Sequence, residues 1–330
     1  MIVNEVSMSH VWWPPWHCPS HGHVLRDEGA VLRCPDGDTY ARRDAIPRFV
    51  LGSHYAEAFG EQWKRYRLTQ LDSYTHTTIT QDRIYRCLGD TLRKELRGKH
   101  VLECGCGAGR FTEILLELGA YVTSIDLSDA VEANQLNFPQ NERHRVAQAD
   151  ISALPFMPQQ FDLVLCLGVV QHTPSPEATL GHLYDAVKPG GALVIDHYTW
   201  NFSWCTKTAP LIRHVAKRLR PEVGIKLTEG LVDIFFPLHK ATRKFRLGQM
   251  VLSRISPVLS YCHAYPQLSD SLLREWALLD THDSLTDWYK HFRTRGEIAK
   301  ALERLGLERI WCEYGGNGVE ARGVRPVHTS

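Results

Sequence analysis

The residues best suited to chemistry are an acid and three glycines in the stretch VLECGCGAGRF, residues 101–111. Glycines at alternate positions after an apolar run let the backbone approach a nucleotide-like ligand closely. A phosphate-binding loop needs a Lys after its last glycine, and a dinucleotide-binding loop needs a third glycine where Arg110 stands, so neither pattern fits. The residues that carry the pattern are Glu103, Gly105, Gly107 and Gly109.

An acid beside the glycine turn suits a cationic ligand better than a pyrophosphate. S-adenosylmethionine is the nucleotide-like cofactor with a cationic amino-acid end, and we expect Glu103 to face it. Asp126 ends the next predicted strand, 21 residues after Gly105, where its carboxylate can accept both ribose hydroxyls. Asp150 and Ile151 end the following strand and suit the adenine amine and ring.

Alternating strands and helices must position these residues. Strand-like and helix-like segments at this spacing predict a doubly wound α/β sheet with mostly parallel strands. The predicted strands are 100–104, 121–126, 144–150, 161–168, 192–198, 307–314 and 319–324, and the predicted helices are 80–96, 110–118, 128–137, 175–187 and 295–305.

Five stretches, namely HVLECGCGAGRF, SIDLS, AQADISALPF, FDLVLCLGVVQHTPSP and VKPGGALVI, resemble the successive motifs of class I S-adenosylmethionine-dependent methyltransferases of the type 11-like group. The resemblance implies a seven-stranded sheet and transfer of a sulfonium methyl group to a nucleophile. It places the cofactor domain at residues 80–200 and 291–330. The cofactor-binding residues that it implies are Glu103, Gly105, Cys106, Gly107, Gly109, Asp126, Leu127, Asp150, Ile151 and Leu167.

Two histidines follow strand ends on the expected acceptor side. His172 and His197 are candidate general bases, because histidine titrates near neutral pH. Alternatively, His172 only packs against the cofactor. The candidate substrate-binding residues are Tyr198, Asp280, His282, Asp283 and Tyr289.

Residues 1–50 contain two knuckle-like stretches, CPSHG and CPDG, that resemble a small zinc ribbon preceding some bacterial methyltransferase domains. The usual pattern has four cysteines, but only Cys18, His21 and Cys34 stand at matching positions here. A structural zinc needs four ligands, so His17, His23, Asp36 or Asp38 would have to complete the set. Three alternatives remain: a ribbon with bound zinc, a degenerate ribbon without metal, and no ribbon at all.

Two further segments flank the expected cofactor domain. Residues 51–79 resemble an aromatic arm that folds over the cofactor, with Trp63 as its anchor, although Trp63 can equally be a core residue. Residues 201–290 look like a helical insertion, broken by several prolines including Pro237. Residues 201–260 hold eleven basic and three acidic residues, a net charge of +8. A basic lid of this kind predicts an anionic or sugar-like acceptor, while a solvated basic face is the alternative.

Composition limits the remaining function classes. The chain has 330 residues, a net charge of +1 and nine cysteines, with no long apolar run and no signal-peptide pattern. We therefore expect a reduced, cytoplasmic enzyme without a transmembrane segment, which methylates a small molecule, more readily at oxygen. The alternatives are an RNA methyltransferase that uses the basic insertion, and a non-catalytic scaffold. The sequence leaves the oligomeric state open.

Overall fold

The computed structural model describes residues 13–50, 52, 54–200 and 207–327. The first residues of the expected ribbon, two positions of the expected arm and the start of the expected insertion lie outside these ranges. A seven-stranded sheet has the order β10-β11-β9-β8-β5-β6-β7, and β11 alone runs against its neighbours. Its strands are β5 (His100–Cys104), β6 (Tyr121–Asp126), β7 (His144–Gln148), β8 (Phe161–Cys166), β9 (Val187–His197), β10 (Glu308–Gly315) and β11 (Gly318–Val324). The predicted doubly wound fold is confirmed.

Helices cover both faces of this sheet because its strands are apolar on both sides. On one face α3 and α4 contribute Ile84, Leu88, Ile114 and Leu115 to one buried cluster, and α6 and α11 contribute Leu183 and Leu302 to another on the opposite face. These helices are α3 (Ile79–Glu95), α4 (Arg110–Glu117), α5 (Ala130–Asn137), α6 (Pro176–Ala186) and α11 (Arg295–Arg304).

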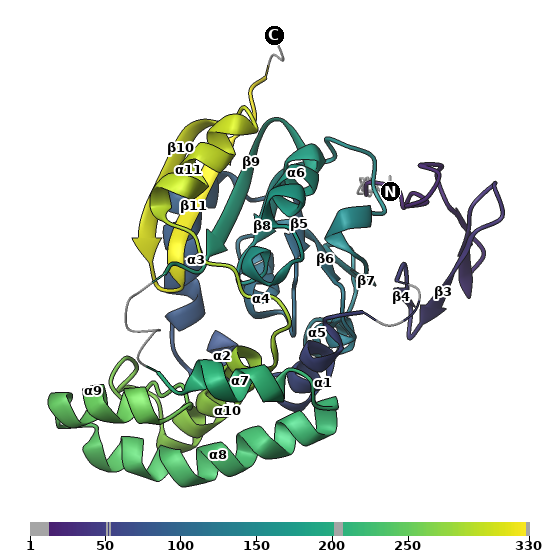
Figure 1. The fold of residues 1–330 in the computed structure, drawn as a ribbon. Coiled ribbons are helices and arrows are strands. Elements are labelled where there is room, and N and C mark those ends of the chain that lie inside the picture. The colour runs from purple at the N-terminus through teal and green to yellow at the C-terminus, as the bar shows by residue number, and fades with distance from the viewer. Residues whose placement is uncertain (1–12, 51, 53, 201–206, 328–330) are drawn as a thin grey trace, which may run out of the picture.

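The N-terminal part forms a separate small sheet beside the β7 edge (Figure 1). Its strands are β1 (Arg26–Asp27), β2 (Val31–Arg33), β3 (Thr39–Arg43) and β4 (Ile46–Pro47). The Phe49 amide donates to the Gln148 carbonyl at 2.8 Å, and Trp16 packs against Phe49 and Phe156. The ribbon is therefore docked on the main domain through aromatic contacts. The chain then continues through two short helices, α1 (Glu57–Arg65) and α2 (Asp72–Thr75).

The insertion is a layer of helices below the carboxyl ends of the parallel strands (Figure 1). It comprises α7 (Ala209–Ala216), α8 (Pro221–Thr242), α9 (Arg246–Ile255) and α10 (Asp270–Thr286). The prediction that Pro237 breaks a helix is wrong, because α8 continues through it. An interior proline costs about 3 kcal/mol, and burial of Val232 and Phe236 against α10 offsets this. No helix in the described part of the chain is both long and apolar enough to cross a membrane.

Candidate active site

A cavity of about 850 Å³ lies between the carboxyl ends of the strands and the insertion. Its volume falls within the usual range for small-molecule sites. We call the part formed by the sheet loops the cofactor half. It contains Gly105, Cys106, Gly107, Asp126, Leu127, Asp150, Ile151 and Leu167. We call the opposite part the acceptor half. It contains His172, Tyr198, Tyr261, Tyr265, Trp276, Asp280, Asp283 and Lys290.

The glycine turn between β5 and α4 has no room for side chains. A Cβ on Gly105, whose φ is +74°, would lie 2.2 Å from a methyl carbon of Val169. A Cβ on Gly107 would lie 3.1 Å from the Trp63 ring, so this ring of α1 packs over the turn. Gly109 does not line the cavity, because it packs against Phe138 and Asn134 beneath the turn. Two of the three glycines therefore form the wall, and the third positions α4.

Glu103 does not line the cavity, contrary to the sequence-based expectation. It is buried in the middle of the sheet, where its Oε2 accepts hydrogen bonds from Thr112 at 2.5 Å and Ser124 at 2.9 Å. Burial raises the pKa of Glu103 to about 7. Side chains alternate across a strand, and Glu103 points away from the cavity. This acid therefore supports the turn from below by joining β5, β6 and α4.

Asp126 and Asp150 lie on the cavity wall at the ends of neighbouring strands. Asp126 accepts hydrogen bonds from the Gly107 amide at 3.0 Å and from Ser128 at 2.7 and 2.8 Å. These contacts fix the carboxylate. Oδ1 accepts both bonds from Ser128, so the remaining acceptor site is on Oδ2. Asp150 accepts from the Ser152 amide at 2.8 Å and begins the short helix η1 (Ile151–Ala153). Both acids are thus held in place before a ligand arrives.

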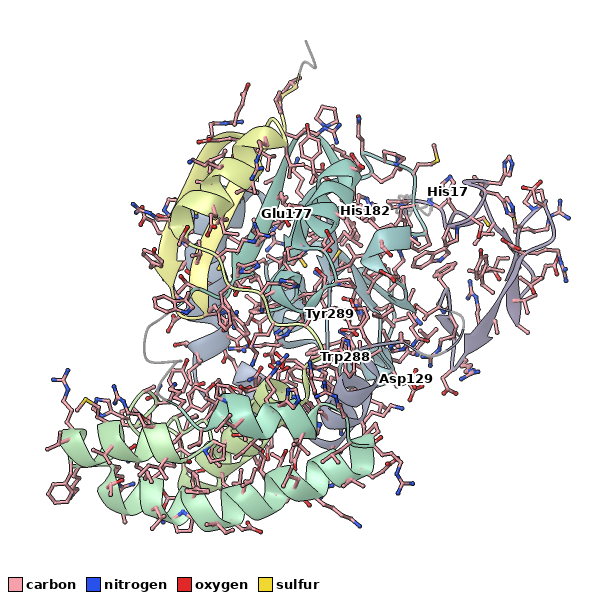
Figure 2. All side chains as sticks on the ribbon, viewed as in Figure 1. His17, Asp129, Glu177, His182, Trp288 and Tyr289 are labelled. Atoms are coloured by element: carbon pink, nitrogen blue, oxygen red, sulfur yellow. The ribbon has the colours of Figure 1, made fainter. Side chains whose placement is uncertain are left out.

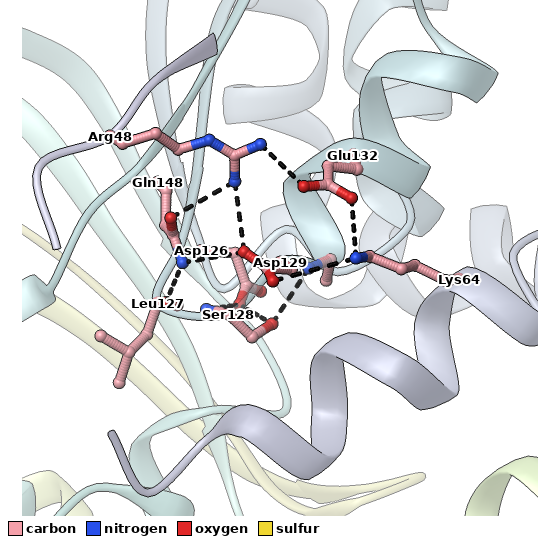
Figure 3. A network of polar contacts seen from close by, with 9 residues as sticks. Arg48, Lys64, Asp126, Leu127, Ser128, Asp129, Glu132 and Gln148 are labelled. Atoms are coloured by element: carbon pink, nitrogen blue, oxygen red, sulfur yellow. Dashed lines mark hydrogen bonds and ion pairs between the residues drawn. The ribbon is translucent and has the colours of Figure 1, made fainter. Parts of the chain in front are cut away.

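A polar network ties the ribbon and the arm to this region (Figure 3). Arg48, just after the ribbon, contacts Asp129 at 3.3 Å and Glu132 at 2.8 Å. Lys64 of α1 contacts the same Glu132 at 2.7 Å. Because Asp129 follows the Asp126–Ser128 turn, Arg48 and Lys64 both hold the loop after β6.

His172 has the surroundings of a general base. Its Nδ1 lies 3.2 Å from Asp287 Oδ2 and 3.1 Å from the Tyr289 carbonyl oxygen. Its Nε2 has no hydrogen-bond partner among the described residues. Burial lowers the pKa of His172, but the contact with Asp287 and the charge of Asp283 raise it more, so the net shift is upward. A carboxylate that holds one ring nitrogen leaves the other available for a proton.

His197 does not line the cavity, in disagreement with its predicted catalytic role. Its Nδ1 faces the Tyr198 carbonyl oxygen at 2.8 Å, and burial lowers its pKa. The reason is the two-residue period of β9, which sends Tyr198 into the cavity and His197 to the other side of the sheet. The sequence placed both histidines near strand ends and could not assign their directions.

The helical period of α10 decides which of the expected substrate residues reach the cavity. Asp280 and Asp283 line it, while His282 points toward α8 and lies 3.2 Å from Thr228 Oγ1. Burial lowers the pKa of His282 to about 4. Tyr289 lies between the sheet and the insertion (Figure 2), but it packs against Tyr55 rather than lining the cavity. Its contribution to the site is its carbonyl group, which faces His172.

Sequence reasoning missed most of the aromatic and cationic wall. Tyr261, Tyr265 and Trp276 form one ring cluster, with centroids 5.1 to 5.5 Å apart. Arg110 lies over Trp276 and donates to Thr80 and Gln70 rather than to a carboxylate. No local motif marks these residues, because they come from segments that only folding brings together.

Among the described basic residues of the insertion, Lys290 at its end is the one that lines the cavity. None of the described lysines and arginines between residues 207 and 260 lines it. The insertion instead contributes aromatic rings, Asp280 and Asp283. The sequence analysis predicted an anionic acceptor from the basic residues between 201 and 260. The described residues of that segment place no lysine or arginine on the cavity wall, so they do not support this prediction.

The three predicted metal ligands of the ribbon do lie together. Cys18 Sγ, His21 Nδ1 and Cys34 Sγ are all within 4.8 Å of one another. Asp38 Oδ2 lies 3.4 Å from Cys18 Sγ and 3.3 Å from His21 Nδ1. Asp36 Oδ2 lies 3.7 Å from Cys34 Sγ, but it is farther from His21, at 4.0 Å, and pairs with His23 at 3.2 Å. His17 faces the Pro15 carbonyl group instead.

Residues 102–195 match the family model described as "Methyltransferase domain". This segment is a methyltransferase domain. A ubiquinone biosynthesis O-methyltransferase of Pseudomonas fluorescens is 39% identical over 103 residues, which cover 30% of this chain and 44% of that protein. The Coxiella burnetii protein of the same name is 33% identical over 109 residues, covering 32% and 47%. The chain thus spans less than half the length of these curated relatives.

Solved methyltransferase structures resemble the methyltransferase domain and its surroundings only loosely. The magnesium protoporphyrin IX methyltransferase of Synechocystis, solved with S-adenosylhomocysteine, is 15% identical with a TM-score of 0.44. That similarity covers 82% of this chain and 96% of the other.

Proposed function

We propose that this protein transfers a methyl group from S-adenosylmethionine to an oxygen of a small molecule. The observation that carries the proposal is a single cavity that joins the glycine turn of the methyltransferase domain to His172. The curated relatives with the same domain are O-methyltransferases, which supports oxygen as the acceptor atom.

The cofactor half fits S-adenosylmethionine. Its turn exposes backbone at Gly105 and Gly107, and Asp126 Oδ2 has acceptor capacity for a ribose hydroxyl. Leu127 and Ile151 offer apolar surface for an adenine ring, and Asp150 an acceptor for its amine. When bound, the cofactor supplies the methyl group on a sulfonium. The protein supplies alignment of the two reactants, which is worth about 7–11 kcal/mol in well-oriented cases.

The acceptor half suits a flat, largely apolar molecule that carries a hydroxyl group. Tyr198, Tyr261 and Trp276 supply rings for its body, and Asp280 and Asp283 supply hydrogen-bond acceptors. His172 takes the hydroxyl proton on Nε2, while Asp287 stabilises the imidazolium that forms. Burial raises the pKa of Asp283 to about 6, so this acid changes protonation just below neutral pH.

The first test is calorimetric titration with S-adenosylmethionine, followed by transfer of a labelled methyl group to a panel of phenols, hydroxylated acids and sugar phosphates. We expect cofactor binding and preferential labelling of uncharged phenolic acceptors. Absence of cofactor binding would favour a scaffold role. Preferential labelling of sugar phosphates would contradict the acceptor class and leave the methyl transfer intact.

We also propose that the ribbon holds a structural zinc ion through Cys18, His21, Cys34 and Asp38. Tetrahedral zinc with these ligand types needs ligand atoms about 3.4–3.8 Å apart. The Cys18–His21 distance is 3.4 Å and the Cys34–His21 distance is 3.8 Å, and both Asp38 distances are close to this range. The Tyr40 hydroxyl lies 3.2 Å from Cys18 Sγ and can orient that ligand.

The matched variants Asp38→Ala and Asp36→Ala test the zinc assignment by elemental analysis of purified protein and by chelator competition. We expect about one zinc per chain in the parent and in Asp36→Ala, and a loss of affinity in Asp38→Ala of about tenfold or more. Less than about 0.2 zinc per chain in the parent protein would establish the metal-free ribbon, given that closed structural sites hold their metal tightly.

A further inference from the structure

The surface of α9 has an unusual composition for a helix at the edge of a globular protein. Leu247 is 70% exposed, and Met250, Val251 and Ile255 on the same face are at least half exposed. These residues recur at the spacing of one helical face. The opposite side, with Gln249 and Leu252, faces α8, and Gln249 donates to Thr242 Oγ1 at 2.8 Å. No residue of α9 is buried.

Basic residues surround this apolar face. Residues 243–256 contain four basic residues and no acid: Arg243, Lys244, Arg246 and Arg254. Of these, Arg243 forms an ion pair with Asp270 of α10 at 3.5 Å. The exposed ring of Phe245 lies between two of them. The neighbouring helix α7 continues the pattern. Thr208, which precedes α7, forms two hydrogen bonds with the end of α9. Helix α7 exposes Leu211 and Val215, and further basic residues stand nearby in the sequence.

We propose that α9, together with the exposed side of α7, is a docking surface for a lipid bilayer with anionic headgroups. An amphipathic helix with apolar residues on one face and lysines or arginines at its flanks lies in the plane of a membrane interface. Anionic headgroups match the positive charge of residues 243–256. A second copy of the chain would place two basic faces against each other, and RNA would leave the apolar side chains in water.

The position of α9 connects this surface to the cavity. Leu259, four residues after the last residue of α9, lines the cavity, as do Tyr261 and Tyr265 in the segment that follows. This part of the insertion therefore presents aromatic residues to the cavity, whereas the exposed apolar and basic residues of α9 face outward. This division explains why the +8 charge of residues 201–260 is absent from the cavity wall.

The test is flotation of the full chain with vesicles of phosphatidylcholine containing about one third phosphatidylglycerol, compared with pure phosphatidylcholine vesicles. We expect binding to the anionic vesicles, with a decrease when salt is raised. The variant Leu247→Glu should lower the partition coefficient about tenfold or more. It removes a Leu side chain that the bilayer would bury, and it adds a negative charge that the anionic headgroups repel.

Leu136→Glu is the matched control, because Leu136 is 68% exposed on α5, outside the proposed surface. It should bind vesicles like the parent protein. Equal loss in both variants, or no vesicle binding by the parent at low salt, would overturn the proposal. The proposal would also be overturned if the parent protein did not bind vesicles but instead bound single-stranded RNA, or associated with itself, and if Leu247→Glu abolished that interaction. Each readout is independent of methyl transfer, so failure of the enzyme assay leaves this proposal standing.

Discussion

The cofactor half and the acceptor half of the cavity are built in different ways. The cofactor half comes from turns that directly follow β5, β6, β7 and β8, each short and local in sequence. The acceptor half combines the loop after β8, the end of β9 and the α9–α10 segment, which are separated by up to about a hundred residues. We therefore propose that the common sheet recognises the donor, whereas the segments that this chain adds to the sheet recognise the acceptor.

The strongest test of the comparison uses the two histidines at strand ends. His172→Gln should lower kcat by about 10²–10⁴, the usual contribution of a general base, whereas His197→Gln should retain most of its turnover because it lies outside the cavity. Both variants should bind the cofactor with parent affinity. Equal activity of the two variants in steady-state kinetics would contradict the assignment.

His172 and His197 should also differ in how they affect the pH dependence of kcat/KM. The pKa of His172 is raised above its ordinary value, and a base acts only when neutral. The kcat/KM of the parent protein should therefore increase as pH rises through the pKa of His172, because more of the imidazole is then neutral. In His172→Gln this acid limb should disappear, while in His197→Gln it should remain. A pH–rate profile of all three proteins checks this.

A smaller effect is expected from the turn of the cofactor half. Gly105→Ala should weaken cofactor binding about tenfold or more, because the added Cβ meets Val169 and a positive φ costs about 1–3 kcal/mol. Gly181→Ala in α6, where no atom lies within 4 Å of the added Cβ, is the control. Calorimetry should show that Gly181→Ala binds S-adenosylmethionine with the affinity of the parent protein. If Gly105→Ala also did so, the cofactor would not approach the backbone at Gly105 closely.

Asp283→Asn should act on the acceptor half alone. Loss of a carboxylate on the wall is expected to raise the acceptor KM several-fold and to leave the cofactor Kd unchanged, because Asp283 lies on α10 rather than on a sheet loop. A change in cofactor Kd without a change in KM would show that the two halves are not separate in function.

Glu103→Gln is expected to have the smallest effect on turnover, because Glu103 is not on the cavity wall. Its folded-state pKa, about 7, lies above its ordinary value of 4.5, so the native protein binds its proton more tightly than the unfolded chain does. The corresponding stability is fully present below pH 4.5 and is lost as pH rises through 7. Urea unfolding at several pH values should show this component in the parent and not in the variant.

The sequence by itself determined the order of the sheet elements, the glycine turn and the donor-side acids. These features depend on local patterns: apolar strands, glycine spacing, and acids at strand ends whose parallel neighbours bring them to one edge. It also marked Cys18, His21 and Cys34, which the ribbon brings together.

Only the tertiary structure decided which side chains meet across the cavity. It turned Glu103 and His197 away, because a one-residue step along a strand reverses the direction of a side chain. It brought Asp287 to His172 and Trp276 to Arg110 across more than a hundred residues. It also kept the described lysines and arginines of residues 207–260 off the cavity wall, which depends on the rotation of each helix against its neighbours rather than on composition.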